Sequence, residues 1–231
     1  MTPLVFLPGM MCDARIFAPQ IAAFSAERFT ACAALTAHDS MKALAQDVLR
    51  LAPERFALAG LSMGGILAME VLRQAPGRVA ALALLDTNPL AERPEIQAKR
   101  QPQIDAVRAG GLSAVMSEQM IPNYLATPDP DHKINALCLD MALALGPEVF
   151  VRQSLALRDR PDQTDVLRRF GGPTLILCGV QDRLCPPERH TLMKSLMPQA
   201  KLEILADCGH LTTLENPQET TAAMSRWLED T

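Results

Sequence analysis

Three side chains that can carry out acyl transfer occur in the order Ser62, Asp182 and His210 along the chain. A serine hydroxyl attacks a carbonyl carbon effectively when a histidine accepts its proton. The imidazole in turn needs a carboxylate that fixes its tautomer and stabilises its charged form. The set predicts a covalent acyl-enzyme on Ser62, with His210 as general base and acid and Asp182 orienting the imidazole.

Ser62 lies in the segment Gly60-Leu61-Ser62-Met63-Gly64-Gly65, which has the pattern G-x-S-x-G. An apolar run, residues 56–59, precedes this segment, and a stretch with helical periodicity follows it. In such a setting the serine adopts a strained backbone conformation, and the flanking glycines let the strand and the helix approach each other. The pattern therefore predicts a nucleophile elbow that presents the Ser62 hydroxyl at the carboxyl end of a strand.

Asp182 and His210 also follow predicted strands. The apolar runs 173–178 and 201–205 precede the two residues. Because the carboxyl ends of parallel strands meet at one edge of a sheet, we expect these side chains and Ser62 to come together there.

Asp86 is the alternative acid, because it ends the predicted strand 79–85, which lies beside the strand of Ser62 in a right-handed winding. Its other interpretation is a carboxylate that stabilises a turn or caps a helix. Asp182 is preferred, since its loop neighbours the strand that precedes His210. Both assignments stay open at this point.

The remaining histidines are weaker candidates for the general base. His190 is expected on the surface of a helix that begins at Pro186-Pro187, and His132 lies in a polar turn. His38 follows the second strand, where it would lie near the rim of the site, but an isolated histidine in a loop usually has no catalytic role.

A tetrahedral intermediate needs two hydrogen-bond donors for its oxyanion, and acyl-transfer sites supply them from backbone N–H groups. Met63, the residue after the nucleophile, is predicted to supply one. Met10 is predicted to supply the other, because the loop Pro8-Gly9-Met10 after the first strand places a flexible glycine just before a free amide.

The composition limits the class of function. The 231 residues have a net charge of -4, with 48% apolar and 21% charged residues, which is ordinary for one globular domain and shows no basic surface for nucleic acid. Apolar runs such as residues 79–85 stop well short of the ~20 residues that cross a bilayer. The expected partner is a small-molecule acyl substrate, with no nucleic acid and no membrane.

No cofactor and no metal are predicted. The six cysteines are scattered without a C-x-x-C pair, which is typical of reduced and mostly buried side chains. The pair of potential ligands in Cys208-Gly209-His210 is too small a set for a metal site. The N-terminal residues show no basic region of a signal peptide, which favours the cytoplasm.

Strands and helices alternate along most of the chain, which indicates a mostly parallel sheet with helices on both faces. The alternation stops between residues 89 and 169, where the pattern is helical and charged. We expect this segment to be an insertion into one domain. The predicted strands are 4–7, 29–35, 56–59, 79–85, 173–178 and 201–205.

Four motifs taken in order resemble those of the α/β-hydrolase superfamily over nearly the whole chain: Leu7-Pro8-Gly9-Met10, Gly60-Leu61-Ser62-Met63-Gly64-Gly65, Gly179-Val180-Gln181-Asp182 and Gly209-His210. The chain looks like the small serine esterase, enol-lactonase and thioesterase branch. The resemblance implies a core of residues 1–88 and 170–231 with six strands, and a helical cap of residues 89–169.

Two departures from the family pattern stand out. The N-terminal antiparallel hairpin is missing, and Pro8 replaces the usual histidine of the first loop, which leaves the oxyanion amide in place but alters how the loop is held.

Two alternatives to a hydrolase of esters, thioesters or lactones keep the same fold. One is a C–C bond hydrolase or lyase that uses the same three side chains, and the other is a non-catalytic, receptor-like ligand-binding protein. The cap side chains decide the substrate. The cap arginines are expected to be solvated, with the alternative that one of them binds a substrate carboxylate bidentately. They are Arg93, Arg100, Arg108, Arg152 and Arg158.

Overall fold

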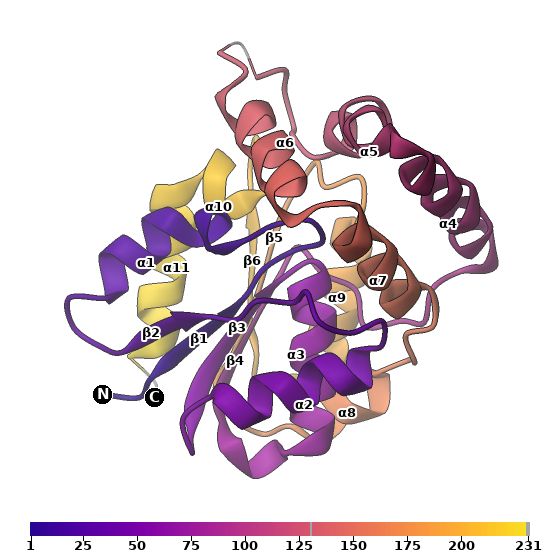
Figure 1. The fold of residues 1–231 in the computed structure, drawn as a ribbon. Helices are drawn as coiled ribbons and strands as arrows, with labels where there is room; N and C mark the ends of the chain where they lie inside the picture. The colour runs from indigo at the N-terminus through magenta and orange to yellow at the C-terminus, as the bar shows by residue number, and fades with distance from the viewer. Residues whose placement is uncertain (130, 230–231) are drawn as a thin grey trace.

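The computed structural model describes residues 1–129 and 131–229. Its centre is a six-stranded sheet in the order β2-β1-β3-β4-β5-β6, and every pair of neighbouring strands is parallel (Figure 1). This confirms the predicted α/β fold class. The strands are β1 Leu4–Leu7, β2 Thr30–Cys32, β3 Phe56–Leu61, β4 Val79–Leu85, β5 Thr174–Gly179 and β6 Lys201–Leu205.

The strand order changes direction once. After β1 the chain adds β2 on one side, and it then crosses β1 to add β3 on the other. Ligands of open parallel sheets bind at the carboxyl ends of the strands beside such a switch point. The loop after β1 and the turn after β3 both lie there, so the topology alone brings the first loop next to Ser62.

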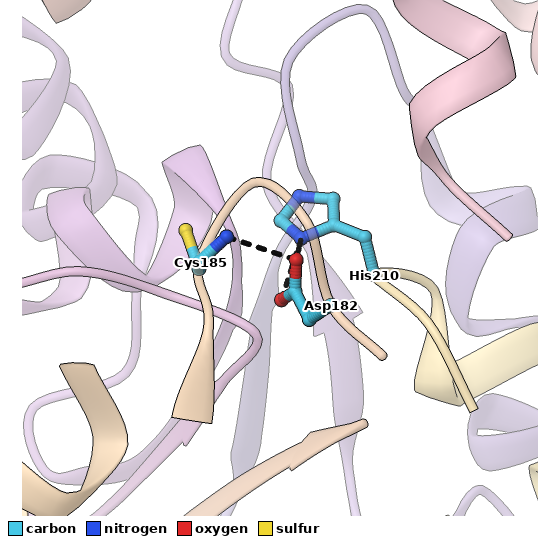
Figure 2. A group of neighbouring side chains, drawn as sticks. All are labelled: Asp182, Cys185 and His210. Carbon is cyan, nitrogen blue, oxygen red and sulfur yellow. Dashed lines mark hydrogen bonds and ion pairs between the residues drawn. The ribbon is translucent and has the colours of Figure 1, made fainter. Parts of the chain in front are cut away.

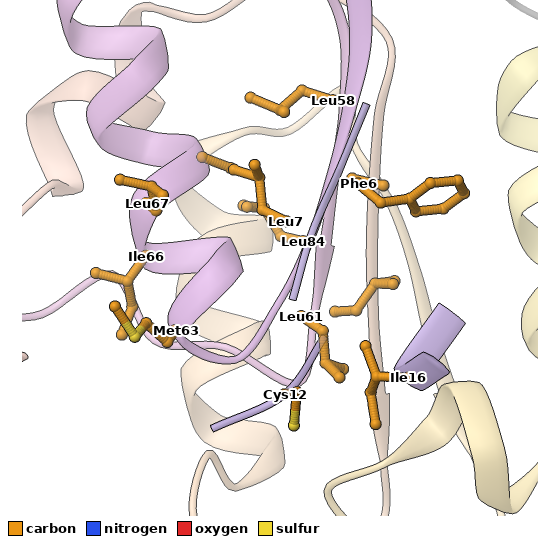
Figure 3. Close-up of a cluster of buried hydrophobic side chains, with 14 of the residues drawn as sticks. Phe6, Leu7, Cys12, Ile16, Leu58, Leu61, Met63, Ile66, Leu67 and Leu84 are labelled. Carbon is orange, nitrogen blue, oxygen red and sulfur yellow. The ribbon is translucent and has the colours of Figure 1, made fainter. Parts of the chain in front are cut away.

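Helices cover both faces of the sheet. The helices α1 (Ala18–Phe24) and α11 (Pro217–Leu228) lie on one face, and α2 (Met41–Leu51), α3 (Met63–Gln74) and α9 (Pro187–Leu196) lie on the other (Figure 1). Every residue of β1, β3 and β5 is buried. In Figure 3 Leu58 and Phe6 extend from opposite faces of the sheet. Burial on two faces explains why these strands are continuous apolar runs rather than alternating ones.

The edge strand β2 is shorter than the predicted strand 29–35. It covers Thr30–Cys32 and its residues are only half-buried. Its single neighbour, β1, is four residues long. The hydrogen bonds to β1 reach one residue further at each end, because the Leu4 N–H donates to the Phe29 carbonyl and the Ala33 N–H donates to the Phe6 carbonyl, both at 2.9 Å. Only residues 34–35 of the predicted run lie beyond this pairing.

The insertion between β4 and β5 is helical, and its described residues contain no strand, as expected. Its helices Pro94–Ala106 and Lys133–Leu145 lie beyond the carboxyl ends of the strands, at the upper right and top of Figure 1, whereas its last helix, Thr164–Arg169, lies lower, beside α3. Its α-helices are α4 Pro94–Ala106, α5 Leu112–Ala114, α6 Lys133–Leu145, α7 Pro147–Arg158 and α8 Thr164–Arg169. The insertion also contains the helical segments η3 Val107–Gly111, η4 Val115–Met120 and η5 Ile121–Asn123. Outside the insertion, the short helical segments are η1 Ala14–Phe17, η2 Pro76–Arg78 and α10 Thr212–Glu215.

The division into a core of residues 1–88 and 170–231 and a cap of residues 89–169 remains our proposal. The last helix of the proposed cap, α8, packs against α3 and α9 of the core. Among the described residues no single helix has the length and apolar content to cross a membrane; α6 and α7 meet the criterion only as a pair, and they are bent by 98°.

The backbone of Gly64 lies so close to that of Leu7 that one added methyl group should lower stability strongly. A Cβ on Gly64 would lie 1.9 Å from the carbonyl oxygen of Leu7. Gly64→Ala should therefore force α3 away from β1 and lower the free energy of unfolding by more than about 3 kcal/mol, or prevent folding. Gly77→Ala is the matched control, because a Cβ there meets nothing within 4 Å. Chemical denaturation of both variants tests this; a Gly64→Ala protein as stable as the control would refute the packing argument.

Candidate active site

Ser62 lies at the turn between β3 and α3, where its backbone has φ 53° and ψ -115°. A positive φ is strained for a residue with a side chain. The turn is held on both sides: the Ser62 N–H donates to the carbonyl of Leu85 at 2.9 Å, and the Ser62 carbonyl accepts from the Thr87 hydroxyl at 2.7 Å. A Cβ on Gly60 would lie 2.3 Å from the carbonyl oxygen of Gly64. Glycine is thus required on both sides of Ser62, as the G-x-S-x-G pattern predicts.

The side chains of Ser62, His210 and Asp182 form one chain of hydrogen bonds. Nε2 of His210 lies 2.9 Å from Oγ of Ser62, and Nδ1 lies 2.8 and 2.9 Å from the two carboxylate oxygens of Asp182. Figure 2 shows His210 and Asp182 facing each other. Both are almost completely buried, which strengthens the interaction between them. The structure therefore brings together the three side chains that the sequence singles out.

The Asp182 carboxylate is held in its charged form. Its Oδ1 accepts hydrogen bonds from the backbone N–H groups of Leu184 and Cys185, both at 2.9 Å. Burial by itself raises the pKa of Asp182, but the charge and hydrogen bond of His210 and the two backbone donors outweigh it, so the pKa is lowered from its ordinary value. The imidazole is therefore paired with a full negative charge at neutral pH.

Three potential metal ligands meet at the same place. One donor atom each of Asp182, Cys185 and His210 lies within 4.8 Å of the others (Figure 2). Both carboxylate oxygens already face the imidazole, and burial, followed by the charge of Asp182, raises the pKa of the Cys185 thiol well above its usual range. A protonated thiol is a poor ligand. The donors therefore fit a hydrogen-bonded pair better than a metal site.

Asp86, the alternative acid, lies beneath the site and has no hydrogen bond to His210 among the described residues. It is fully buried, and its oxygens accept from the Gly179 N–H at 3.2 Å and from the Thr212 hydroxyl at 2.6 Å. Burial and then the charge of Asp182 raise the pKa of Asp86 well above its ordinary value, although these hydrogen bonds oppose the shift. Asp86 thus connects Gly179, where the loop of Asp182 begins, with Thr212, where the loop of His210 ends.

The prediction that His190 lies on the surface is wrong. Its side chain is fully buried, and Nε2 accepts a hydrogen bond from the Thr87 N–H at 3.0 Å. Burial lowers the pKa of His190 to about 4, so the ring is neutral and can accept from this donor. The helix α9 packs against β5 and β6, and its His190 reaches the backbone just after β4, at Thr87. The sequence of α9 is largely polar and does not indicate which face of the helix is buried, because that depends on the elements that pack against it.

The two predicted oxyanion donors follow Ser62 and Gly9 in the chain, and Gly9 lies close to Ser62. Met63 is the first residue of α3, so its N–H has no intrahelical partner. In the first loop, a Cβ on Gly9 would lie 3.7 Å from Cβ of Ser62. No protein acceptor is found for the N–H of Met10 or Met63 within residues 1–129 and 131–229. Both amides are therefore available to a bound group.

Gln153, which the sequence reasoning missed, holds this loop from the cap. Its Oε1 accepts from the Met11 N–H at 2.8 Å, and its Nε2 donates to the Leu35 carbonyl at 2.8 Å. Met11 has a positive φ of 54°, so a firm contact is needed to keep it there. The side chain is 1% exposed. An uncharged amide on the apolar face of α7 is the signal that could have found it.

The cap also touches the loop that carries His210. The His210 N–H donates to the carbonyl of Tyr124 at 2.6 Å. The carboxylate of Glu215 accepts from the N–H of Ala126 at 2.7 Å and from that of Gly209 at 3.0 Å. Cap and core thus share the hydrogen bonds that position the imidazole.

A cavity of about 490 Å³ lies between the core and the cap. Ser62 and His210 line it from the core, and α4 lines it from the cap. The expectation that Arg100 is solvated is wrong: it is buried and paired with Glu92 in the cavity wall. The reason is that α4 covers the cavity with the face that carries Arg100. The volume suits a small organic ligand.

Comparison with known proteins gives similar enzymes. The chain is 28% identical to a thermophilic esterase from Thermogutta terrifontis with malate bound, with a TM-score of 0.89 over 100% of this chain and 91% of that one. The enol-lactonase from Burkholderia xenovorans shares the fold at 20% identity, with a TM-score of 0.85 over 99% and 92% of the chains. A pimeloyl-[acyl-carrier protein] methyl ester esterase from Citrobacter koseri is 23% identical over 80% of this chain and 74% of its own length.

The family model described as "Alpha/beta hydrolase family" matches residues 4–223, which is nearly the whole chain. The match covers the turn at Ser62, the loop of Asp182 and the loop of His210. The chain therefore belongs to the alpha/beta hydrolase family, as its motifs predicted.

Proposed function

We propose that the chain is a serine hydrolase that cleaves a small carboxylic ester, thioester or lactone through an acyl-enzyme on Ser62. The observation that carries the proposal is the continuous line of hydrogen bonds from Oγ of Ser62 through His210 to Asp182. Its family and its esterase relatives make the chain a hydrolase that acts on ester bonds. The finer assignments, of residues and of substrate, are ours.

The proposed mechanism uses the hydrogen bonds between Ser62, His210 and Asp182. Nε2 of His210 takes the proton as Oγ of Ser62 attacks the carbonyl carbon, and Asp182 stabilises the resulting imidazolium. The N–H groups of Met10 and Met63 bind the oxyanion of the tetrahedral intermediate. His210 then gives the proton to the leaving group. Water, activated by the same imidazole, releases the acid and restores Ser62.

The wider setting is also a proposal. Residues 89–169 form the cap that excludes water and selects a small acyl substrate. A cytoplasmic location, the independence from cofactors and metals, and the lack of nucleic-acid and membrane partners stay predictions from the composition. The alternatives of a C–C bond hydrolase or lyase and of a receptor-like binder use the same pocket, and they differ in whether an ester is turned over and whether Ser62 forms an adduct.

The nucleophile is tested by Ser62→Ala. Loss of the attacking oxygen should reduce kcat for an activated ester by a factor on the order of 10⁶, while folding stays intact because no cavity is opened. A fluorophosphonate probe should label the parent on Ser62 and leave this variant unlabelled. Ser117→Ala, at an exposed cap position, is the control and should match the parent. Full turnover in Ser62→Ala would contradict the assignment, and an unlabelled parent would favour a binding protein.

The two buried acids are compared by Asp182→Asn and Asp86→Asn. The first presents the wrong partner to the imidazole, and kcat should fall by as much as about 10⁴. The second keeps an oxygen that can accept from Gly179 or Thr212 at a position with no hydrogen bond to His210 among the described residues, so kcat should change little and stability should fall by about 1 kcal/mol. Turnover numbers and denaturation curves give both values.

The pH profile is a second readout of the same pair. Activity of the parent should rise with pH, because the imidazole accepts a proton only when neutral. The pKa of Asp182 is lowered, so its charge is present throughout this rise. Removing that charge should move the rise to lower pH in Asp182→Asn and leave it in place in Asp86→Asn. The opposite pattern would make Asp86 the orienting acid.

A further inference from the structure

The wall of the cavity contains a buried cluster with excess positive charge. Glu92 lies between two guanidinium groups: Oε1 accepts from Nη2 of Arg100 at 2.7 Å and from Nη1 of Arg160 at 2.6 Å, and Oε2 accepts from Nε of Arg100. The three side chains are 3%, 11% and 8% exposed, respectively. One carboxylate thus faces two permanent cations that have lost most of their water. The cluster therefore has one positive charge more than its carboxylate neutralises. Burying such an uncompensated charge is costly, so a further negative charge would stabilise the cluster.

Both guanidinium groups keep unused donors. Nη1 of Arg100 reaches only the sulfur of Met10, at 4.0 Å, and a thioether is a weak acceptor. Nε of Arg160 donates to the Leu90 carbonyl, and Nη1 donates to Glu92 and to the Leu157 carbonyl. No partner is found for Nη2 in the part of the chain that the structure describes. Arg100 and Arg160 both line the cavity. The missing negative charge can therefore come from a ligand in the cavity.

The rest of the lining has the same sign. Its charged side chains are six cations and a single carboxylate, that of Glu92, although the whole chain has a net charge of -4. A cleft lined by one sign of charge concentrates ligands of the opposite sign. The other cations are Arg93, Lys99, Arg183 and Arg189.

The cluster lies close to the reaction centre. Nη1 of Arg100 is 4.0 Å from Sδ of Met10, the residue whose amide is the proposed oxyanion donor. Adding the bonds of the methionine side chain, the guanidinium is no more than about 10 Å from that amide. One small molecule can therefore place a carbonyl at the oxyanion donors and an anion at Arg100.

We infer that the cavity binds an ester that carries a carboxylate besides its reacting carbonyl, and that Arg100 and Arg160 bind this carboxylate. The inference rests on the proposed serine hydrolase function. A guanidinium fork matches the two oxygens of a carboxylate, which compensates the excess charge beside Glu92. The carboxylate can belong to the acyl part or to the alcohol part of the ester, and the substrates below separate these two sources.

The first test compares matched esters with the parent protein. Monomethyl esters of succinic, glutaric and adipic acid carry the charge in the acyl part, the butyrate ester of glycolic acid carries it in the alcohol part, and the dimethyl esters carry none. The kcat/KM of one charged class should exceed that of the neutral esters by roughly 10- to 100-fold, the range for charge-assisted hydrogen bonds. Equal or faster turnover of the neutral esters would overturn the inference while leaving the hydrolase assignment intact.

The second test separates recognition from a purely structural ion cluster. Arg100→Gln and Arg160→Gln should each lower the ratio of kcat/KM for the charged ester to kcat/KM for the neutral ester about 10-fold or more. Glu92→Gln, which frees donors on both arginines, should keep or increase the preference. Arg108→Gln, at an exposed cap position outside the cavity lining, is the control and should change neither rate. A parallel fall on both esters in all three cavity variants would reduce the cluster to a structural role and overturn the inference.

Binding gives a readout that does not need turnover. Calorimetry with Ser62→Ala should detect adipate, with an affinity that falls as salt is added, and the same protein with Arg100→Gln should bind it at least about 10-fold more weakly. Absence of adipate binding would overturn the inference even if esters are hydrolysed. A parent that hydrolyses no ester but binds adipate through Arg100 would instead refute the proposed function and keep the anion site.

Discussion

The close approach of the turn at Ser62 to its neighbours is the constraint on which the site depends. Two glycines let β3, α3 and the end of β1 meet at distances that no Cβ would permit, and Ser62 keeps a positive φ between them. The strained turn is stabilised by the carbonyl of Leu85, at the end of β4, and by the side-chain hydroxyl of Thr87, just after it. Because these contacts fix the backbone of Ser62, its hydroxyl has a defined direction before any substrate binds.

Two buried carboxyl groups near each other have different environments. Asp182 receives backbone N–H groups and an imidazole, which favour its charge, whereas burial and the charge of Asp182 favour the neutral form of Asp86. This difference assigns different tasks to similar side chains. Asp182 faces the imidazole of His210. Asp86 connects the loop that starts at Gly179 with Thr212, which follows the loop of His210.

The cap is part of the site in a direct structural sense. It accepts the His210 N–H through Tyr124, holds the first loop through Gln153, and lines the cavity with Arg100 and Glu92. Residues of the proposed cap are therefore hydrogen-bonded to the loops that carry His210 and Met11. A substitution that moves Tyr124 or Gln153 is expected to disturb these loops.

Local patterns determined the strands, the turn at Ser62 and the order Ser62, Asp182 and His210, because apolar runs and glycine spacing act through neighbouring residues. Whatever depends on distant partners needed the tertiary structure. That Asp182 rather than Asp86 faces His210, that His190 is buried, and that cap arginines pair with a carboxylate each depend on which loops and helix faces meet. Sequence periodicity says that a helix has a buried face, but only packing decides what lies against it.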